Sequence, residues 1–226
     1  MFDRVHLIGA GRAGSAVAAR LRERGLTVTV ARDPDPGAEL VILAVPDARI
    51  GEVAQRVPIG PWVAHLSGAT SVAALAPHDP DRRFVVHPLQ TLTRDRGPEQ
   101  LDGAWGALTF ETDAAQAAAR RLAELLGLRP FVLADADKPI YHAGAAVASN
   151  FLVTLERVAA RLVAEAGVPA EALVPLMTRT IENGFQLTGP IARGDWTTVE
   201  SHLAALEERA PDLVPLYRAL AEATRP

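Results

Sequence analysis

The chain has 226 residues, of which 49% are hydrophobic, enough for packed cores in one large domain or two small ones. Its net charge of −4 and its scattered arginines exclude an extended surface for a nucleic-acid backbone. Because cysteine is absent, disulfides, thiolate catalysis and cysteine-ligated metal are excluded, and we expect no metal site.

Up to about residue 134, short apolar or β-branched runs alternate with Ala/Leu/Arg stretches of helical period. This pattern is typical of β-α units on a parallel sheet. The expected strands are residues 5–8, 27–31, 40–44, 62–66, 84–86, 107–110 and 131–133. The expected helices are residues 13–24, 50–56, 72–76 and 114–126.

From residue 135 onward the sequence consists almost entirely of helix formers. It predicts a long helix over 139–166, ended by Gly167-Val-Pro169, and shorter helices near 170–183, 197–208 and 213–224. We therefore expect an α/β domain over 1–134 and a smaller all-α domain over 135–226. Such a small helical domain often completes its core by pairing with another copy of itself.

A glycine-rich turn lies between the first expected strand and the first expected helix. Its glycines allow a tight turn, close approach to a pyrophosphate and close helix packing, as in Rossmann-type dinucleotide domains. The alternative is a fold that keeps this turn only for packing. The residues expected to bind the cofactor here are Gly9, Ala10, Gly11, Arg12, Ala13 and Gly14.

The end of the second strand selects between NADP and NAD. Arg32 suits the 2′-phosphate of NADP, and Arg12 could support it. Asp33 follows directly, so NAD stays possible, and Arg32 could also be only a solvated surface residue. We expect NADP.

The carboxyl ends of the middle strands should line the cofactor crevice. We place the backbone of Ala44, Val45 and Pro46 and the pair Ser67 and Gly68 there as cofactor contacts. His87, before a proline, and Gln90 follow the fifth strand and are expected to contact the substrate, although a capping or packing role for His87 is equally open.

Lys138 is the only lysine in a chain whose lysines and arginines total 23. An arginine cannot release its proton, whereas a partly desolvated lysine can, so Lys138 is a candidate proton donor; an accidental surface lysine is the alternative. Asp135-Ala-Asp137-Lys138-Pro139 predicts a helix start with Asp as the cap. His142 and Asn150 follow on or beside the same helix face as candidate catalytic residues, or as ordinary interhelical hydrogen-bonding partners.

A turn-rich segment at 187–195 contains Thr188 and Arg193, candidate anion-binding residues for a substrate carboxylate or a cofactor phosphate. Asp195 could instead cap the next helix.

The glycine loop, Ala-Val-Pro, His-Leu-Ser-Gly, His-Pro-Leu-Gln-Thr, the helix from Lys138 to Asn150 and Leu-Thr-Gly-Pro-Ile-Ala-Arg-Gly-Asp together resemble a family of two-domain Rossmann-type oxidoreductases. This family sits within the superfamily of 6-phosphogluconate dehydrogenase, ketopantoate reductase and pyrroline-5-carboxylate reductase. The resemblance implies a lysine and an asparagine acting on the substrate, here Lys138 and Asn150. It also implies a homodimer formed through the helical domains, with residues 188–195 reaching the partner's cleft.

The leading hypothesis is an NADP-dependent reductase of a small 2-oxo acid or imine, with a ketopantoate-like substrate first. Lys138 would donate the proton, His142 would tune or relay it, and Asn150 would orient the substrate. The alternatives are a non-catalytic NADP-binding sensor or scaffold dimer, and a deazaflavin–NADP oxidoreductase. With no signal peptide and no long apolar run, we expect a cytoplasmic protein without nucleic-acid or membrane partners.

Overall fold

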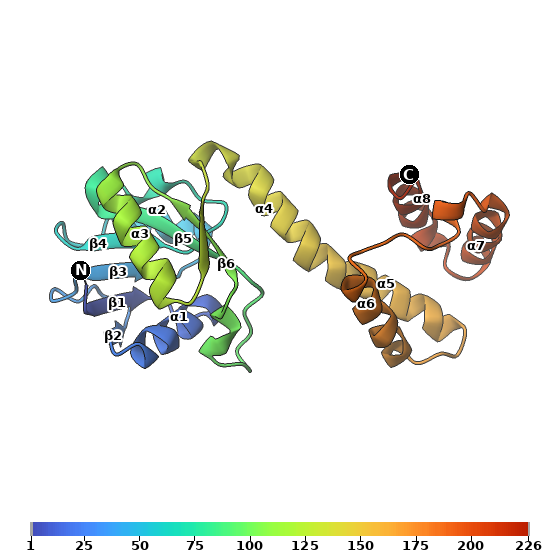
Figure 1. Ribbon diagram of the computed structural model, residues 1–226, viewed down its shortest axis with the longest axis horizontal. Coiled ribbons are helices and arrows are strands. Elements are labelled where there is room, and N and C mark those ends of the chain that lie inside the picture. Colours follow the sequence, from blue (N-terminus) through green and yellow to red (C-terminus); the bar gives the residue numbers. More distant parts are fainter. Residues whose placement is uncertain (1, 226) are drawn as a thin grey trace. The chain divides into compact units, whose positions relative to one another are not determined.

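The computed structural model describes residues 2–225, which form two compact units that divide between Val147 and Ala148. The division comes later than the boundary after residue 134 that the sequence suggests. The reason is that the first helix after the sheet begins with a lysine buried in the first unit. Figure 1 shows the elements of each unit.

Within the described residues, the first unit has a seven-stranded sheet in the order β2-β1-β3-β4-β5-β6-β7. Its strands are β1 (Arg4–Ile8), β2 (Thr27–Val30), β3 (Leu40–Leu43), β4 (Trp62–His65), β5 (Arg83–Leu89), β6 (Trp105–Thr109) and β7 (Arg129–Val132). Its α-helices are α1 (Arg12–Glu23), α2 (Ile50–Ala54), α3 (Asp113–Leu125) and α4 (Lys138–Ala146). This is the expected Rossmann-type α/β fold, and each expected strand overlaps an observed one.

The sequence pattern suggested a parallel sheet, but the observed sheet is mixed. Strand β6 runs antiparallel to β5, with Leu89 opposite Trp105, and β7 is parallel to β6. The link between β5 and β6 has only a short 3-10 turn, Pro98–Leu101, where a parallel crossover needs a helix or a similar connection. The chain therefore re-enters the sheet at the edge where β5 ends.

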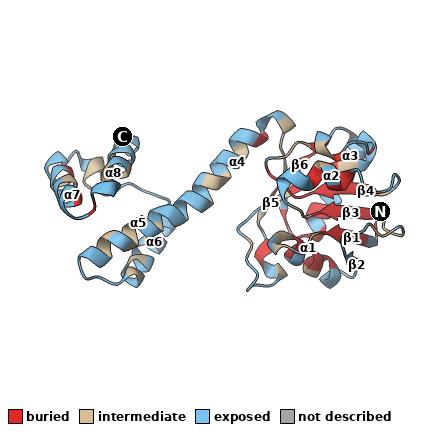
Figure 2. Ribbon diagram, turned by 180° about the vertical axis from the view of Figure 1, so that it is seen from behind, coloured by how far each residue is buried: buried red, intermediate tan, exposed pale blue. Residues whose placement is uncertain are grey.

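The core follows the period-two alternation of the strands. Leu40 and Ile42 face one side of the sheet, where α1 and α3 pack, while Val41 and Leu43 face the other, where α2 packs. Strand β3 is thus buried on both faces, which explains its unbroken apolar run. Figure 2 shows the buried residues gathered in the sheet and the helices that cover it.

The second unit consists of helices with few buried residues. The long helix expected over 139–166 is α4, a π-helical turn (Val147–Phe151) and α5 (Leu152–Glu165). The unit continues with α6 (Leu173–Glu182), α7 (Trp196–Arg209) and α8 (Val214–Ala223). Among its described hydrophobic residues, only Val199, Leu206 and Ala210 are buried. Across residues 2–225, no helix combines the length and the apolarity that crossing a bilayer would require.

Candidate functional site

The three glycines of the loop between β1 and α1 differ in their surroundings. Gly9 has φ +113°, and a Cβ there would lie 2.3 Å from the carbonyl oxygen of Ala44. A Cβ on Gly14 would lie 2.1 Å from the carbonyl oxygen of Gly9, so a side chain would separate α1 from the strand. A Cβ on Gly11, by contrast, would have no atom within 4 Å apart from those of the adjoining backbone. The turn and the helix packing need Gly9 and Gly14, and the open space lies at Gly11.

This loop fits the pyrophosphate of a dinucleotide. Gly11 is the N-cap residue of α1 and no side chain caps that helix end. The first-turn amides of α1 are therefore available to an anion, and the helix dipole favours negative charge there. A side chain at Gly11 would fill the space that such a group needs.

The two arginines expected around a 2′-phosphate do not line one pocket. Arg32 is exposed just after β2, at the edge of the sheet, and the neighbouring carboxylate of Asp33 pairs with Arg56 at 3.0 Å. Arg12 instead lines a pocket together with Arg94 and Arg96, and Arg32 does not line that pocket.

The loop after β4 is organised around Ser67. Its hydroxyl donates to the carboxylate of Asp47 at 2.7 Å and accepts the backbone N–H groups of Ala69 and Thr70, at 3.2 and 2.9 Å. Ser67 was expected to contact the cofactor, and the structure shows its hydroxyl holding this loop. The carboxyl edge of β4 is consequently a rigid platform.

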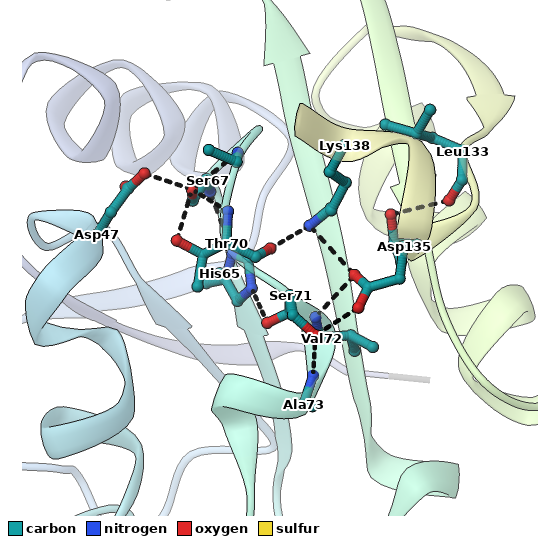
Figure 3. A network of polar contacts seen from close by, with 12 residues as sticks. Asp47, His65, Ser67, Thr70, Ser71, Val72, Ala73, Leu133, Asp135 and Lys138 are labelled. Atoms are coloured by element: carbon teal, nitrogen blue, oxygen red, sulfur yellow. Dashed lines mark hydrogen bonds and ion pairs between the residues drawn. The ribbon is translucent and has the colours of Figure 1, made fainter. Parts of the chain in front are cut away.

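Lys138 is packed against that loop although it is the first residue of α4. It is 1% exposed, its ammonium donates to the carbonyl of Thr70, and Nζ lies 3.8 Å from a carboxylate oxygen of Asp135 (Figure 3). Burial lowers the pKa of Lys138 from 10.5 to about 8, while the charges of Asp135 and Asp47 act in the opposite direction. The lysine is therefore protonated at neutral pH yet able to release its proton.

Asp135 connects the start of α4 to the same loop. Its carboxylate accepts the hydroxyl of Ser71 and the backbone N–H of Val72, the latter at 3.0 Å. The expected capping role for an Asp is wrong, since Asp137 occupies the N-cap position of α4 and makes no side-chain cap hydrogen bond. Asp135 thus fixes a loop rather than a helix end.

His65, at the end of β4, is neutral in this network. Its Nδ1 accepts the backbone N–H of Ser67 at 3.1 Å, so Nε2 bears the proton and donates to the carbonyl of Ser71 at 3.3 Å. Burial, reinforced by the charge of Lys138, lowers the pKa of His65 to about 4.

A second cluster joins β5 to α4. His87 Nδ1 and the hydroxyl of Tyr141 share a 2.8 Å hydrogen bond, and the rings of His87 and His142 lie 6.1 Å apart. A Cβ on Gly68 would lie 2.7 Å from His87 and 2.9 Å from His142, so both rings pack on that glycine. Burial lowers the pKa of His87 to about 4 and raises that of Tyr141 to about 12, which leaves both neutral at physiological pH.

The structure thus brings together Lys138, His142, His87, Ser67 and Gly68 within the first unit, whereas the sequence assigned Lys138 and His142 to the helical domain. His87 lies inside β5 rather than after it, because β5 extends to Leu89. Pro88 is tolerated there because it pairs only with β6, beyond the stretch that pairs with β4.

Other expected site residues lie elsewhere. Gln90 is exposed and its side-chain oxygen accepts the N–H of Thr91 at 2.9 Å. Asn150 is exposed in the π-helical turn and belongs to the second unit. In that unit, Arg193 donates to the carbonyl of Thr188 at 2.6 Å, and Asp195 caps α7 through the N–H of Thr198.

Tyr141 and the roles of Asp47, Thr70 and Asp135 were not predicted from the sequence. The position of Tyr141 next to His142 in the helix was the available signal. The contacts of Thr70 and Asp135 arise from a loop whose course has no motif.

No curated protein matches the sequence. A family model described as "Domain of unknown function (DUF2520)" matches residues 107–224. The chain is similar in structure to a "putative NADP oxidoreductase" from Bacteroides fragilis, BF3122, at 19% identity and a TM-score of 0.81, covering 97% of this chain and 96% of that one. Protein TM1727 from Thermotoga maritima gives 24% identity, a TM-score of 0.72 and coverages of 97% and 98%.

A further similar structure is 1-pyrroline-5-carboxylate reductase from Streptococcus pyogenes, with 16% identity and a TM-score of 0.63. The alignment covers 98% of this chain and 96% of the reductase. At these identities the likeness establishes the fold, over nearly the whole length of each protein.

Proposed function

Because the chain belongs to the family of the domain of unknown function DUF2520 and has an open glycine loop on a Rossmann-type sheet, we propose that it is an NADP-dependent oxidoreductase. Its substrate is a small 2-oxo acid or imine, with a ketopantoate-like acid first. A nicotinamide dinucleotide supplies the hydride when bound. The chain's own part is to bind the dinucleotide, orient the substrate and provide a proton.

The preference for NADP rests on the end of β2. Arg32 is exposed and has no ion-pair partner within residues 2–225, so its guanidinium is available to a 2′-phosphate. Asp33, which could bind the ribose hydroxyls of NAD, has its carboxylate paired with Arg56. The residues next to the pyrophosphate are those of the glycine loop.

The observation that best supports the proposed activity is the burial of Lys138. Its lowered pKa makes the ammonium a better acid than any exposed lysine, and it lies at the loop after β4, on the edge where Rossmann-type proteins bind the cofactor. We assign proton donation to Lys138. We assign to His142 the role of tuning or relaying that proton transfer. His87 and Tyr141 present neutral hydrogen-bonding groups to the substrate.

The test is NADPH oxidation with a panel of 2-oxo acids and cyclic imines, with Lys138→Arg compared with Arg120→Lys, an exchange on the exposed side of α3. We expect Lys138→Arg to bind NADPH as the wild type does and to lose turnover by about 10²-fold to 10⁴-fold. Unchanged turnover would exclude Lys138 as the donor.

Two other outcomes identify the alternative functions. NADPH binding without reduction of any substrate would favour a sensor or scaffold. Oxidation of NADPH only by a deazaflavin would favour a deazaflavin–NADP oxidoreductase.

We also propose that the second unit pairs with a second copy of the chain. It buries few residues yet exposes Leu176 at 64% and Phe185 at 68%, an amount of apolar surface that helical units usually cover by association. In such a dimer, Asn150, Thr188 and Arg193 would orient the substrate anion.

Sedimentation equilibrium tests this pairing. The wild type is expected at twice the chain mass of 24.0 kDa, and Leu176→Glu is expected at the monomer mass because it places a charge on the apolar face. Gln55→Glu adds the same charge to the first unit and should leave the dimer intact. A monomeric wild type at micromolar concentration contradicts the proposal.

A further inference from the structure

A pocket of about 380 Å³ lies between α1 and the segment that follows β5. It does not include the residues around Lys138. The residues that line it are Arg12, Ser15, Ala16, Ala19, Thr93, Arg94, Arg96, Gly97 and Pro98. Three of them are arginines and none is acidic.

These three arginines are not neutralised by the protein. Within residues 2–225, Arg12, Arg94 and Arg96 make no ion pair, whereas Arg20 and Arg83 in the same unit pair with carboxylates. Guanidinium groups that share one pocket repel each other, and an anion bound among them would remove that repulsion.

The segment bearing Arg94 and Arg96 is held in a defined shape by the buried side chain of Gln100. The amide nitrogen of Gln100 donates to the carbonyls of Arg96 and Gly97, both at 2.9 Å, and its oxygen accepts the N–H of Thr93 at 2.8 Å. The backbone that presents the two arginines is therefore organised before any ligand binds.

A second clamp fixes this segment to the helix on the other side of the pocket. The guanidinium of Arg20, on α1, donates to the carbonyl of Pro98 at 2.7 Å and pairs with Asp102 at 2.8 Å. The two walls of the pocket thus hold a fixed separation, which favours a compact ligand group.

The residue that we assign to the 2′-phosphate of NADP does not line the pocket. Arg32 follows β2, whereas Arg94 and Arg96 follow β5, in the segment that forms the wall of the pocket opposite α1. We propose that the arginine pocket binds the phosphate group of a ligand other than the dinucleotide. Guanidinium forks match phosphate oxygens in geometry as well as in charge. This site does not depend on the proposed oxidoreductase activity.

Calorimetric titration with inorganic phosphate, against sodium chloride at matched ionic strength, tests the site. The variant Arg94→Gln/Arg96→Gln removes two of the pocket's charges. The matched control Arg120→Gln/Arg121→Gln removes two exposed charges from α3, outside the pocket. Because all four side chains are exposed and unpaired in the described structure, both variants should keep the wild-type circular dichroism spectrum and melting temperature. NADPH and NADH affinities are measured in parallel by fluorescence.

We expect the pocket variant to bind phosphate at least about tenfold more weakly than the wild type and the control, with NADPH and NADH affinities changed by less than about twofold. Equal phosphate affinity in all three proteins, or no saturable binding in the wild type, overturns the proposal. A loss of NADPH affinity alone would reassign the pocket to the 2′-phosphate, and a loss for both dinucleotides to their pyrophosphate. Either result also overturns it.

Discussion

The side-chain amine of Lys138 donates a hydrogen bond to the backbone carbonyl of Thr70, 68 residues earlier in the chain. This bond, together with the bond from the N–H of Val72 to Asp135, ties the start of α4 to the loop after β4. The chain's only lysine is therefore part of the structure of the sheet edge as well as the candidate proton donor.

Replacing Lys138 by methionine should change how stability depends on pH. A pKa lowered from 10.5 to about 8 means that the unfolded chain binds more protons than the folded one between those values. The folded state therefore bears a penalty of roughly 3 kcal/mol below pH 8 that is relieved as pH rises. The wild-type free energy of unfolding should increase between pH 8 and 9.5. Urea unfolding should show no such increase in Lys138→Met, and Arg120→Met should behave as the wild type.

Removing the charge of Asp135 should lower the pKa of Lys138 further. The carboxylate raises that pKa by stabilising the ammonium, and Asp135→Asn keeps the side-chain shape without the charge. Because Lys138 is the only lysine, ¹³C-lysine labelling gives one side-chain signal to titrate by NMR. We expect a midpoint below about 8 in Asp135→Asn and a smaller change in the control Asp137→Asn. An unchanged midpoint would show that the 3.8 Å ion pair has no electrostatic effect.

His65 should contribute to acid sensitivity. Its folded pKa of about 4 lies below the usual 6.5, so protonation of the unfolded chain lowers stability as pH falls from 6.5 towards 4. The loss is roughly 3 kcal/mol for a shift of this size. His65→Gln should lose part of the wild-type pH dependence in this window, because His87 and His6, whose pKa values are also lowered, retain their own share. His202→Gln, at an exposed histidine, should keep the full slope in urea unfolding, and equal slopes in both variants would count against this account.

Two glycine substitutions should have opposite effects. Gly68→Ala places a methyl group 2.7 Å from His87 and 2.9 Å from His142, and should lower the free energy of unfolding by about 1–3 kcal/mol. Gly144→Ala, in α4 with nothing within 4 Å, should raise it by about 0.5–1 kcal/mol. Denaturant titration of both variants checks the pair, and a stable Gly68→Ala protein would mean that the two rings can move aside.

The strands and most helices could be predicted because they depend on local patterns. The run Leu40–Leu43 is apolar at every position since both of its faces are buried, and that is visible in the sequence. The direction of β6 was not visible, because it depends on where residues 90–104 lead the chain. The π-helical turn at Val147–Phe151 likewise has no sequence signal, since neither proline nor glycine marks it.

For the candidate site, the sequence predicted single residues but not their partners. The pKa of Lys138 is lowered chiefly by burial, which is the cause that its expected partial desolvation implied. Thr70 and Asp135 could not be assigned, because their contacts require a loop and a helix start to meet. The packing of Tyr141 against His87 depends on the register of α4 over β5, which no local pattern sets.

Because Lys138 is buried, the chemical reactivity of its amine can be used to measure local opening of the structure. Lys138 bears the only side-chain amine in the sequence, and the residue is 1% exposed. An amine-selective acylating reagent can modify it only when the first turn of α4 separates from the loop after β4. The rate of acylation at this one position, read by mass spectrometry, therefore measures how often the sheet edge opens, and ligands that hold it closed will slow that rate.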